Sequence, residues 1–272
     1  LHDARARLDQ REELHQAVMV GDSYEADVLG ARRAGLHAVW YNPHGAPCPS
    51  AHPAYDATVA DLRALPAILA APFLPDVPTC LAWLAEQDAT GDLLPHVRLV
   101  AAVAFRLAER LAAAGEEVNP LLAHRGGLLH DLGKVSARTR GVSHDLGAGR
   151  LLRERGLPVL ASIAERHPVW APLTPGQQPA TWEEKLVYYA DRISEPAGIV
   201  SIDERMAAML ARRRERTSAV NEVSSTDEAS STDEAAYRAA ARSMEQEIAG
   251  RLGMTSGDIM AWLRSVIDDP AG

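Results

Sequence analysis

The sequence has little cysteine, little lysine and no long apolar run. Only two of its 272 residues are cysteines, Cys48 and Cys80, and they do not form a CxxC spacing. This argues against both a disulfide framework and a thiolate zinc site. No stretch approaches the roughly 20 apolar residues of a membrane-spanning helix, and no charged-then-apolar leader opens the chain. We therefore expect a cytoplasmic protein without a membrane partner, although a start at Leu1 leaves room for an upstream segment.

Positive charge is also scarce. The chain has 28 lysines and arginines against 37 acidic residues, a formal net charge of -9, and no basic block stands out. This argues against a nucleic-acid partner bound through phosphate contacts. A small anionic substrate stays possible, because a local metal centre can outweigh a negative surface. The length and the 47% hydrophobic content are enough for two folded units.

The first part of the chain has an α/β pattern. A polar helix is expected over 1–15, followed by a short buried strand over 17–20 that ends at Gly21-Asp22-Ser23. A helix over 24–35 and a second strand over 36–41 complete a βαβ unit, and 42–56 reads as loop. Asp22 then lies at the carboxyl end of a parallel strand, where open α/β sheets place their ligand sites.

These residues resemble the haloacid dehalogenase (HAD) superfamily of phosphatases. The resemblance rests on its fourth motif, Val-Gly-Asp-Ser-Tyr-Glu-Ala-Asp at 20–27, and on the Gly-Ala-x-x-Ala-Gly pattern at 30–35. It implies that Asp22 binds Mg²⁺ and that Asp27 supports this site.

Two features of the HAD pattern are missing. The nucleophile motif, an Asp-x-Asp, is absent, and the only lysines, Lys134 and Lys185, lie too far downstream to supply the lysine of the third motif. Without a nucleophile, Asp22 has no covalent chemistry to assist. We therefore interpret 1–72 as the carboxyl-terminal part of a HAD domain, with a degenerate domain kept as a scaffold as the alternative.

The pattern over 76–216 is helical throughout. Its central feature is His130-Asp131, which follows two leucines and precedes Gly133, a residue that can end a helix. An imidazole and a carboxylate are costly to bury without a partner, and a cation is such a partner. Six polar residues at the ends of helical segments are therefore candidate ligands: His96, His130, Asp131, His144, His167 and Asp191.

The type and number of these ligands favour a catalytic centre. Imidazole and carboxylate without thiolate suit Mn, Fe, Mg or a catalytic Zn. Six groups are too many for one ion that also keeps water and substrate. Two divalent ions would use them all if Asp131 bridged the pair, and such a pair activates water and stabilises the charge on a phosphate ester.

Residues 78–215 resemble the HD superfamily of metal-dependent phosphohydrolases. The order His, His-Asp, Asp is met by His96, His130-Asp131 and Asp191, and His-Asp-Leu-Gly-Lys resembles the HDIG form of the motif. The two further histidines resemble the binuclear branch of dinucleoside tetraphosphatases and HD-GYP phosphodiesterases, although the GYP signature of the cyclic-di-GMP enzymes is absent.

The resemblance also implies roles. One ion would be held by His96, His130, Asp131 and Asp191, and the other by Asp131, His144 and His167. Asp131 and Lys134 would be the catalytic residues, and Lys134 and Arg192 would contact the substrate.

The fold expected from these patterns is mainly α: an all-α HD-domain helical bundle preceded by a partial α/β (HAD, Rossmann-like) segment. The expected activity is hydrolysis of a nucleotide-type phosphoester or phosphoanhydride by a metal-bound hydroxide. Three alternatives stay open: an enzyme with one ion, a non-catalytic module that senses a nucleotide, and HAD phosphatase activity with a nucleophile from an upstream segment.

The tail contains a tandem repeat. Ser-Ser-Thr-Asp-Glu-Ala at 224–229 recurs at 230–235, so 217–236 is interpreted as an acidic Ser/Thr linker, with a helix extension as the alternative. Two amphipathic helices are expected within 237–272. They either fold back on the bundle or form a homodimer contact.

Overall fold

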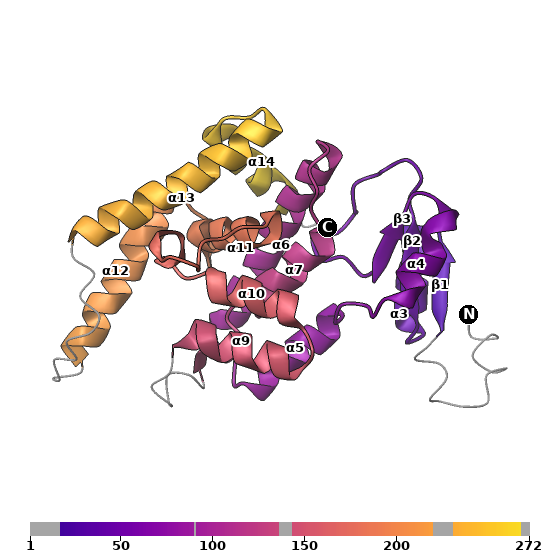
Figure 1. The fold of residues 1–272 in the computed structure, drawn as a ribbon, viewed down its shortest axis with the longest axis horizontal. Helices are drawn as coiled ribbons and strands as arrows, with labels where there is room; N and C mark the ends of the chain where they lie inside the picture. Colours follow the sequence, from indigo (N-terminus) through magenta and orange to yellow (C-terminus); the bar gives the residue numbers. More distant parts are fainter. Residues whose placement is uncertain (1–16, 90, 136–142, 220–230, 268–272) are drawn as a thin grey trace. The chain divides into compact units, whose positions relative to one another are not determined.

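The computed structural model describes residues 17–89, 91–135, 143–219 and 231–267. The chain divides into two compact units between Cys80 and Leu81, inside helix α5 (Val77–Glu86). Figure 1 shows strands only as minor elements beside many helices, which confirms the expected mainly α fold with a small α/β segment. The helix expected over 1–15 lies outside the described residues. No helix in the described ranges is long and apolar enough to cross a membrane.

The first unit contains a three-stranded parallel sheet. Its strands are β1 (Val18–Gly21), β2 (His37–Tyr41) and β3 (Ala57–Val59), in the order β1-β2-β3. The third strand is not expected from the sequence, because it has only three residues and follows a proline-rich loop. After it come a 3₁₀ turn (Leu62–Ala64) and helix α4 (Leu65–Ala70).

The connection between β1 and β2 also differs from the expected single α-helix. It begins as a π-helix (Tyr24–Leu29) and continues as α3 (Gly30–Arg33). The main-chain oxygen of Ser23 accepts from both the Asp27 and the Val28 amide, at 2.9 and 3.2 Å. The second bond spans five residues and widens the first turn.

The helices of the second unit begin where the sequence places capping residues. Asn119 accepts from the amide of Leu122 at 3.1 Å, and Thr181 and Glu184 form a capping box. The helices are α6 (Leu93–Ala113), α7 (Pro120–Leu129), α9 (His144–Glu154), α10 (Pro158–Arg166), α11 (Trp182–Ile193), α12 (Ile202–Ala219), α13 (Ser231–Leu252) and α14 (Ser256–Ile267).

A short hairpin interrupts the helical pattern that the sequence analysis expects throughout this unit. Strands β4 (Ser194–Glu195) and β5 (Gly198–Ile199) pair antiparallel between α11 and α12. Pro196 disfavours a continuing helix, and Gly198 has a φ of 136°, which an L side chain rarely adopts. The hairpin reverses the chain, so that α12 packs back on α11. A 3₁₀ turn (Ala171–Leu173) also lies between α10 and α11.

The core of the second unit is built around α6, α7 and α11. A Cβ atom on Gly127 would lie 2.6 Å from the Cα of Ala101, so α7 and α6 approach each other as closely as backbones allow. Every residue of α11 from Leu186 to Ile193 is buried. The close contact at Gly127 fixes the end of α7, which leads into His130 and Asp131.

The two C-terminal helices fold back on this bundle. The hydroxyl of Tyr189 donates to Glu245 of α13 at 2.9 Å, and the Arg110 guanidinium lies 4.7 Å from the Trp262 ring centre of α14. Helix α13 runs beside α12 (Figure 1) and begins at Ser231, inside the range given to the linker, and α12 extends to Ala219. Residues 220–230 lie outside the described ranges.

We predict that Gly127→Ala lowers the free energy of unfolding by about 1–3 kcal/mol, because its methyl group overlaps backbone atoms of α6 that cannot move aside. Gly250→Ala is the matched control. Gly250 is helical and exposed, with nothing within 4 Å of an added Cβ, so its replacement should stabilise the protein by roughly 0.5–1 kcal/mol. Urea unfolding of both variants measures these differences. Equal changes in the free energy of unfolding for the two variants would contradict the close contact between α6 and α7.

Candidate metal centre

All six predicted ligand residues converge in the second unit. They come from five helical segments: the first turn of α6, the residues that follow α7, the first residue of α9, the residue that ends α10, and the last turns of α11. Ligand atoms lie within 4.8 Å of one another in each of three groups, namely His96–His130–Asp131, Asp131–His144–His167 and His130–His167–Asp191. Asp131 belongs to two of these groups.

The two oxygens of Asp131 face different pairs of imidazoles. Oδ2 lies 3.5 Å from Nε2 of His130 and 3.9 Å from Nε2 of His96. Oδ1 lies 3.6 Å from Nε2 of His144 and 3.7 Å from Nε2 of His167. The carboxylate therefore stands between two pairs of nitrogen ligands, and its side chain is only 1% exposed.

Hydrogen bonds fix the tautomers of two histidines. Nδ1 of His130 lies 2.7 Å from the main-chain oxygen of Gly127, and Nδ1 of His167 lies 2.6 Å from that of Ala164. A carbonyl oxygen only accepts, so Nδ1 carries the proton in each neutral ring. The lone pair of each ring is then on Nε2, which points to Asp131. This is the tautomer that a metal ligand needs.

Several polar atoms in this cluster are buried without a hydrogen-bond partner among the described residues. They are Nε2 of His96, Nε2 of His130 and Oδ1 of Asp131. Burying such atoms unpaired costs free energy, and each of them can donate a lone pair to a cation. The residues present therefore fit a divalent metal, and their mixture of imidazole and carboxylate suits a catalytic one.

Burial shifts the pKa values of the histidines. It lowers the pKa of His96, of His144 and, most strongly, of His167, which keeps these rings neutral and their lone pairs available. Burial also acts to lower the pKa of His130, but the Asp131 and Asp191 carboxylates and the bond to Gly127 together outweigh it, so the net shift is upward. Protons therefore compete for His130 more than for the other three.

Both carboxylates are held in the ionised form. Burial alone would raise the pKa of Asp131, but Lys134 and His130 lower it well below its usual range. Burial would likewise raise the pKa of Asp191, and Arg192, His96 and Arg205 hold it well below its usual range. The cluster thus contains two negative charges at neutral pH.

The two predicted substrate contacts have different surroundings. Lys134 places Nζ 2.5 Å from Oδ2 of Asp131, and 27% of its side chain is exposed. Arg192 is buried, bonds to Asp191, and has its guanidinium 5.2 Å from the Tyr188 ring centre. Its Nε and Nη1 have no hydrogen-bond partner in the described ranges. Substrate contact by Arg192 therefore stays a prediction, and its observed contacts fix Asp191.

Sequence reasoning does not find Arg205. This arginine of α12 is buried, and its Nη2 lies 3.2 Å from Oδ1 of Asp191. The two residues are 14 positions apart, with a hairpin between them, so no helical spacing relates them. Within the charged face of α12, nothing in the sequence distinguishes Arg205 from its neighbours.

The HAD-like aspartates of the first unit do not assemble a comparable centre. Asp22 is exposed, and Asp27 accepts from the amide of Ser23 at 3.0 Å. A Cβ on Gly21 would lie 2.2 Å from Oδ2 of Asp27, so glycine is required at that position. Neither aspartate belongs to a group of three potential ligands among the residues that the structure describes.

Comparison with known proteins agrees with this arrangement. A model of the HD domain matches residues 93–196, which include all six clustered ligands, and a HAD-hydrolase-like model matches residues 1–64. An uncharacterized protein of Methanocaldococcus jannaschii is 35% identical over 125 residues, which cover 42% of this chain and 72% of that protein. The chain belongs to the HD-domain family. HD domains form a superfamily of metal-dependent phosphohydrolases, and the two domain matches together point to hydrolase activity.

Two other relatives are longer proteins. The tRNA (cytidine(56)-2'-O)-methyltransferase of Picrophilus torridus is 27% identical over 146 residues, covering 49% of this chain and 40% of that enzyme. The enzyme of the same name from Thermoplasma volcanium is 30% identical over 131 residues, covering 44% of this chain and 37% of that enzyme. The HD-domain chain spans less than half the length of both methyltransferases. No solved structure matches it significantly.

We predict that divalent metal stabilises the protein against heat. An ion that coordinates the buried atoms around Asp131 binds only the folded state. At a free metal concentration of about 100 times Kd, this adds about 2.7 kcal/mol to the free energy of unfolding. Thermal melts with Mn²⁺, Mg²⁺ or Zn²⁺ and with a chelator measure this shift. The shift should shrink as the pH falls through the histidine range, because protons compete for the rings. An equal shift in Asp131→Ala would contradict the assignment.

Proposed function

We propose that this chain is a binuclear metal-dependent phosphohydrolase that acts on a nucleotide-type phosphoester or phosphoanhydride. The observation that carries the proposal is the position of Asp131, whose two oxygens face separate pairs of imidazoles. One ion beside each oxygen would give both pairs a cation, whereas a single ion beside one oxygen would serve only the pair that faces it. We assign His96, His130, Asp131 and Asp191 to one ion and Asp131, His144 and His167 to the other.

Divalent ions held there would supply an activated water and stabilise negative charge on the phosphate oxygens. The residues of the chain provide the rest. Asp131 fixes the spacing of the two halves of the site, and the bonds from His130 and His167 to main-chain oxygens hold their rings in orientation. The buried surroundings exclude bulk water, which strengthens each electrostatic contact.

Lys134 is proposed to bind the substrate phosphate. It contacts Oδ2 of Asp131, the oxygen that also faces His96 and His130, so a cation at that oxygen competes with the lysine for it. The displaced ammonium group then has its charge available for a phosphate oxygen. Lys134 and His144 are also more exposed than the other members of the cluster, so substrate would approach from their side.

Local charge favours an anionic substrate despite the net charge of the chain. Three cations, Lys134, Arg192 and Arg205, contact the two carboxylates of the cluster. These contacts neutralise the two carboxylates before any metal binds, so divalent ions held there would make the site positive, which attracts phosphate esters. A nucleotide as the substrate rests on the resemblance to the HD superfamily, and methylation is an activity of the two longer relatives alone.

We predict that metal-loaded protein hydrolyses an aryl phosphate or a nucleotide and that Asp131→Ala lowers kcat/KM by about 10³-fold or more. The substitution removes a contact to both ions, which corresponds to several kcal/mol of transition-state stabilisation. Steady-state assays with Mn²⁺ or Fe²⁺ measure this loss. His44→Ala, in an exposed loop of the other unit, is the histidine control and should keep full activity.

The same variants separate the alternatives. His144→Ala and His167→Ala should each lose activity and reduce the metal content from two ions to one. If both variants keep activity and one ion, the single-ion enzyme is correct. Nucleotide binding without turnover under every metal would instead identify a sensing module. Full activity in Asp131→Ala would overturn the proposed function.

A further inference from the structure

Asp191 is held by a residue that lies outside the HD match. Arg205 donates from Nε to the main-chain oxygen of Asp191 at 3.0 Å and from Nη2 to its Oδ1 at 3.2 Å. The remaining nitrogen, Nη1, donates to Glu195 of the hairpin. One guanidinium therefore fixes both the backbone and the side chain of Asp191.

The shared oxygen links Arg205 to the ligand cluster. Oδ1 of Asp191 lies 3.2 Å from Arg205 and 3.1 Å from Nε2 of His96, so one oxygen stands between the guanidinium and the imidazole. Arg192 takes the other oxygen, Oδ2. The direction in which Oδ1 presents its lone pairs to the cluster is thus set by Arg205.

The chemistry of this contact requires arginine. The three donors point to three separate acceptors, and the side chain is only 9% exposed. A lysine carries the same charge but presents a single nitrogen, which cannot reach all three acceptors in fixed directions. Glu195 is fixed in turn by Arg212 at 2.8 Å, so the acceptor on the hairpin is also immobilised.

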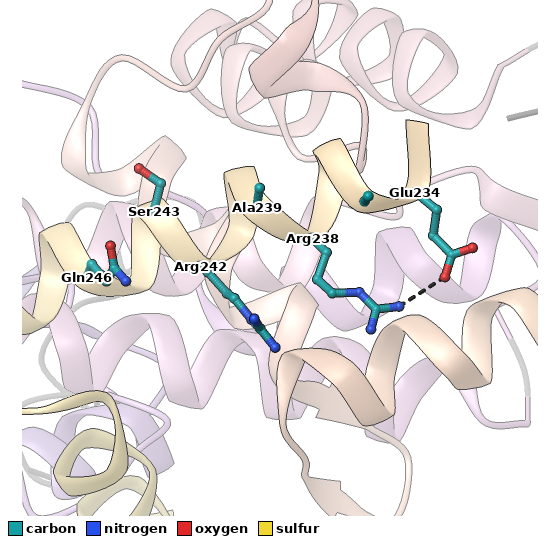
Figure 2. Close-up of a pocket in the computed structure, with 7 residues that line it drawn as sticks. Glu234, Arg238, Ala239, Arg242, Ser243 and Gln246 are labelled. Atoms are coloured by element: carbon teal, nitrogen blue, oxygen red, sulfur yellow. Dashed lines mark hydrogen bonds and ion pairs between the residues drawn. The ribbon is translucent and has the colours of Figure 1, made fainter. Parts of the chain in front are cut away.

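The helix that carries Arg205 is anchored at a second place. Asp203 of α12 accepts from Arg238 at 3.1 Å and from Arg242 at 2.6 Å, both on α13. Figure 2 shows these two arginines beside a cavity of about 620 Å³, with Arg238 also bonded to Glu234. None of the six candidate ligands lines this cavity. The contact therefore offers a control on the same helix, α12, away from the ligands.

We propose that Arg205 is a positioning residue for metal binding, which orients the Asp191 carboxylate toward the ion that His96 and His130 share. The proposal rests on the proposed function, because it concerns one of the ions assigned there. It also extends the functional unit of this chain beyond residue 196, where the HD match ends, to the hairpin and α12.

Mn²⁺ binding to the chelator-treated 272-residue protein tests this role. Isothermal titration calorimetry should show that Arg205→Gln lowers the affinity for one of the two Mn²⁺ ions by about 10–100-fold. This is the usual effect of losing a residue that orients a ligand. Arg205→Lys should lower the Mn²⁺ affinity nearly as much, because a positive charge without the planar set of guanidinium donors does not fix the carboxylate. Arg242→Gln, which removes an exposed ion pair to α12, should bind Mn²⁺ as the wild type does.

A double-mutant cycle separates positioning from general stability. If Arg205 acts through Asp191, adding Arg205→Gln to Asp191→Asn should change Mn²⁺ affinity by less than about 2-fold. An equal loss in both backgrounds would show a merely structural role and overturn the proposal, as would unchanged affinity in Arg205→Gln and Arg205→Lys. If Arg205→Gln does not fold, Arg205→Lys takes its place in the cycle, and the same criteria apply to its Mn²⁺ affinity.

Failure of this proposal is distinct from failure of the proposed function. Wild-type protein that binds Mn²⁺ and hydrolyses phosphoesters, with Arg205 variants of unchanged affinity, overturns the role of Arg205 alone. Wild-type protein that neither binds Mn²⁺ nor hydrolyses any phosphoester overturns both.

Discussion

The burial of one carboxylate among four imidazoles is the constraint on which the second unit depends. Asp131 is 1% exposed and has an imidazole within 4 Å of each of its oxygens. An ionised group in such a place needs compensating charge, since its desolvation is otherwise too costly. Lys134 provides part of that charge. The neutral tautomers of His130 and His167 leave a lone pair on each Nε2 that can coordinate a cation.

The helices place these groups by ending at the cluster or beginning there. Gly127 lets α7 approach α6, which brings His130 to His96, and the start of α9 and the end of α10 bring in the other two histidines. Arg205 of α12 holds the carboxylate that α11 contributes. Contacts between the helices thus help to set the geometry of the site.

Much of this arrangement follows from local sequence signals. The His-Asp pair before a glycine, the caps at Asn119 and Thr181, and the mainly α fold are readable because they depend on neighbouring residues. The sequence does not predict the hairpin at 194–199, the short strand β3 or the π-helix, because few residues form each of them. Arg205 is missed for a different reason: its partner lies across a chain reversal that helical periodicity does not predict.

We propose that Asp131 stands between two metal ions. Crystals of the full chain grown with Mn²⁺, measured near the manganese absorption edge, would show it directly in an anomalous difference map. We expect two peaks, one beside each oxygen of Asp131, with His96 and His130 at the first and His144 and His167 at the second. A single peak, or peaks away from Asp131, would contradict it.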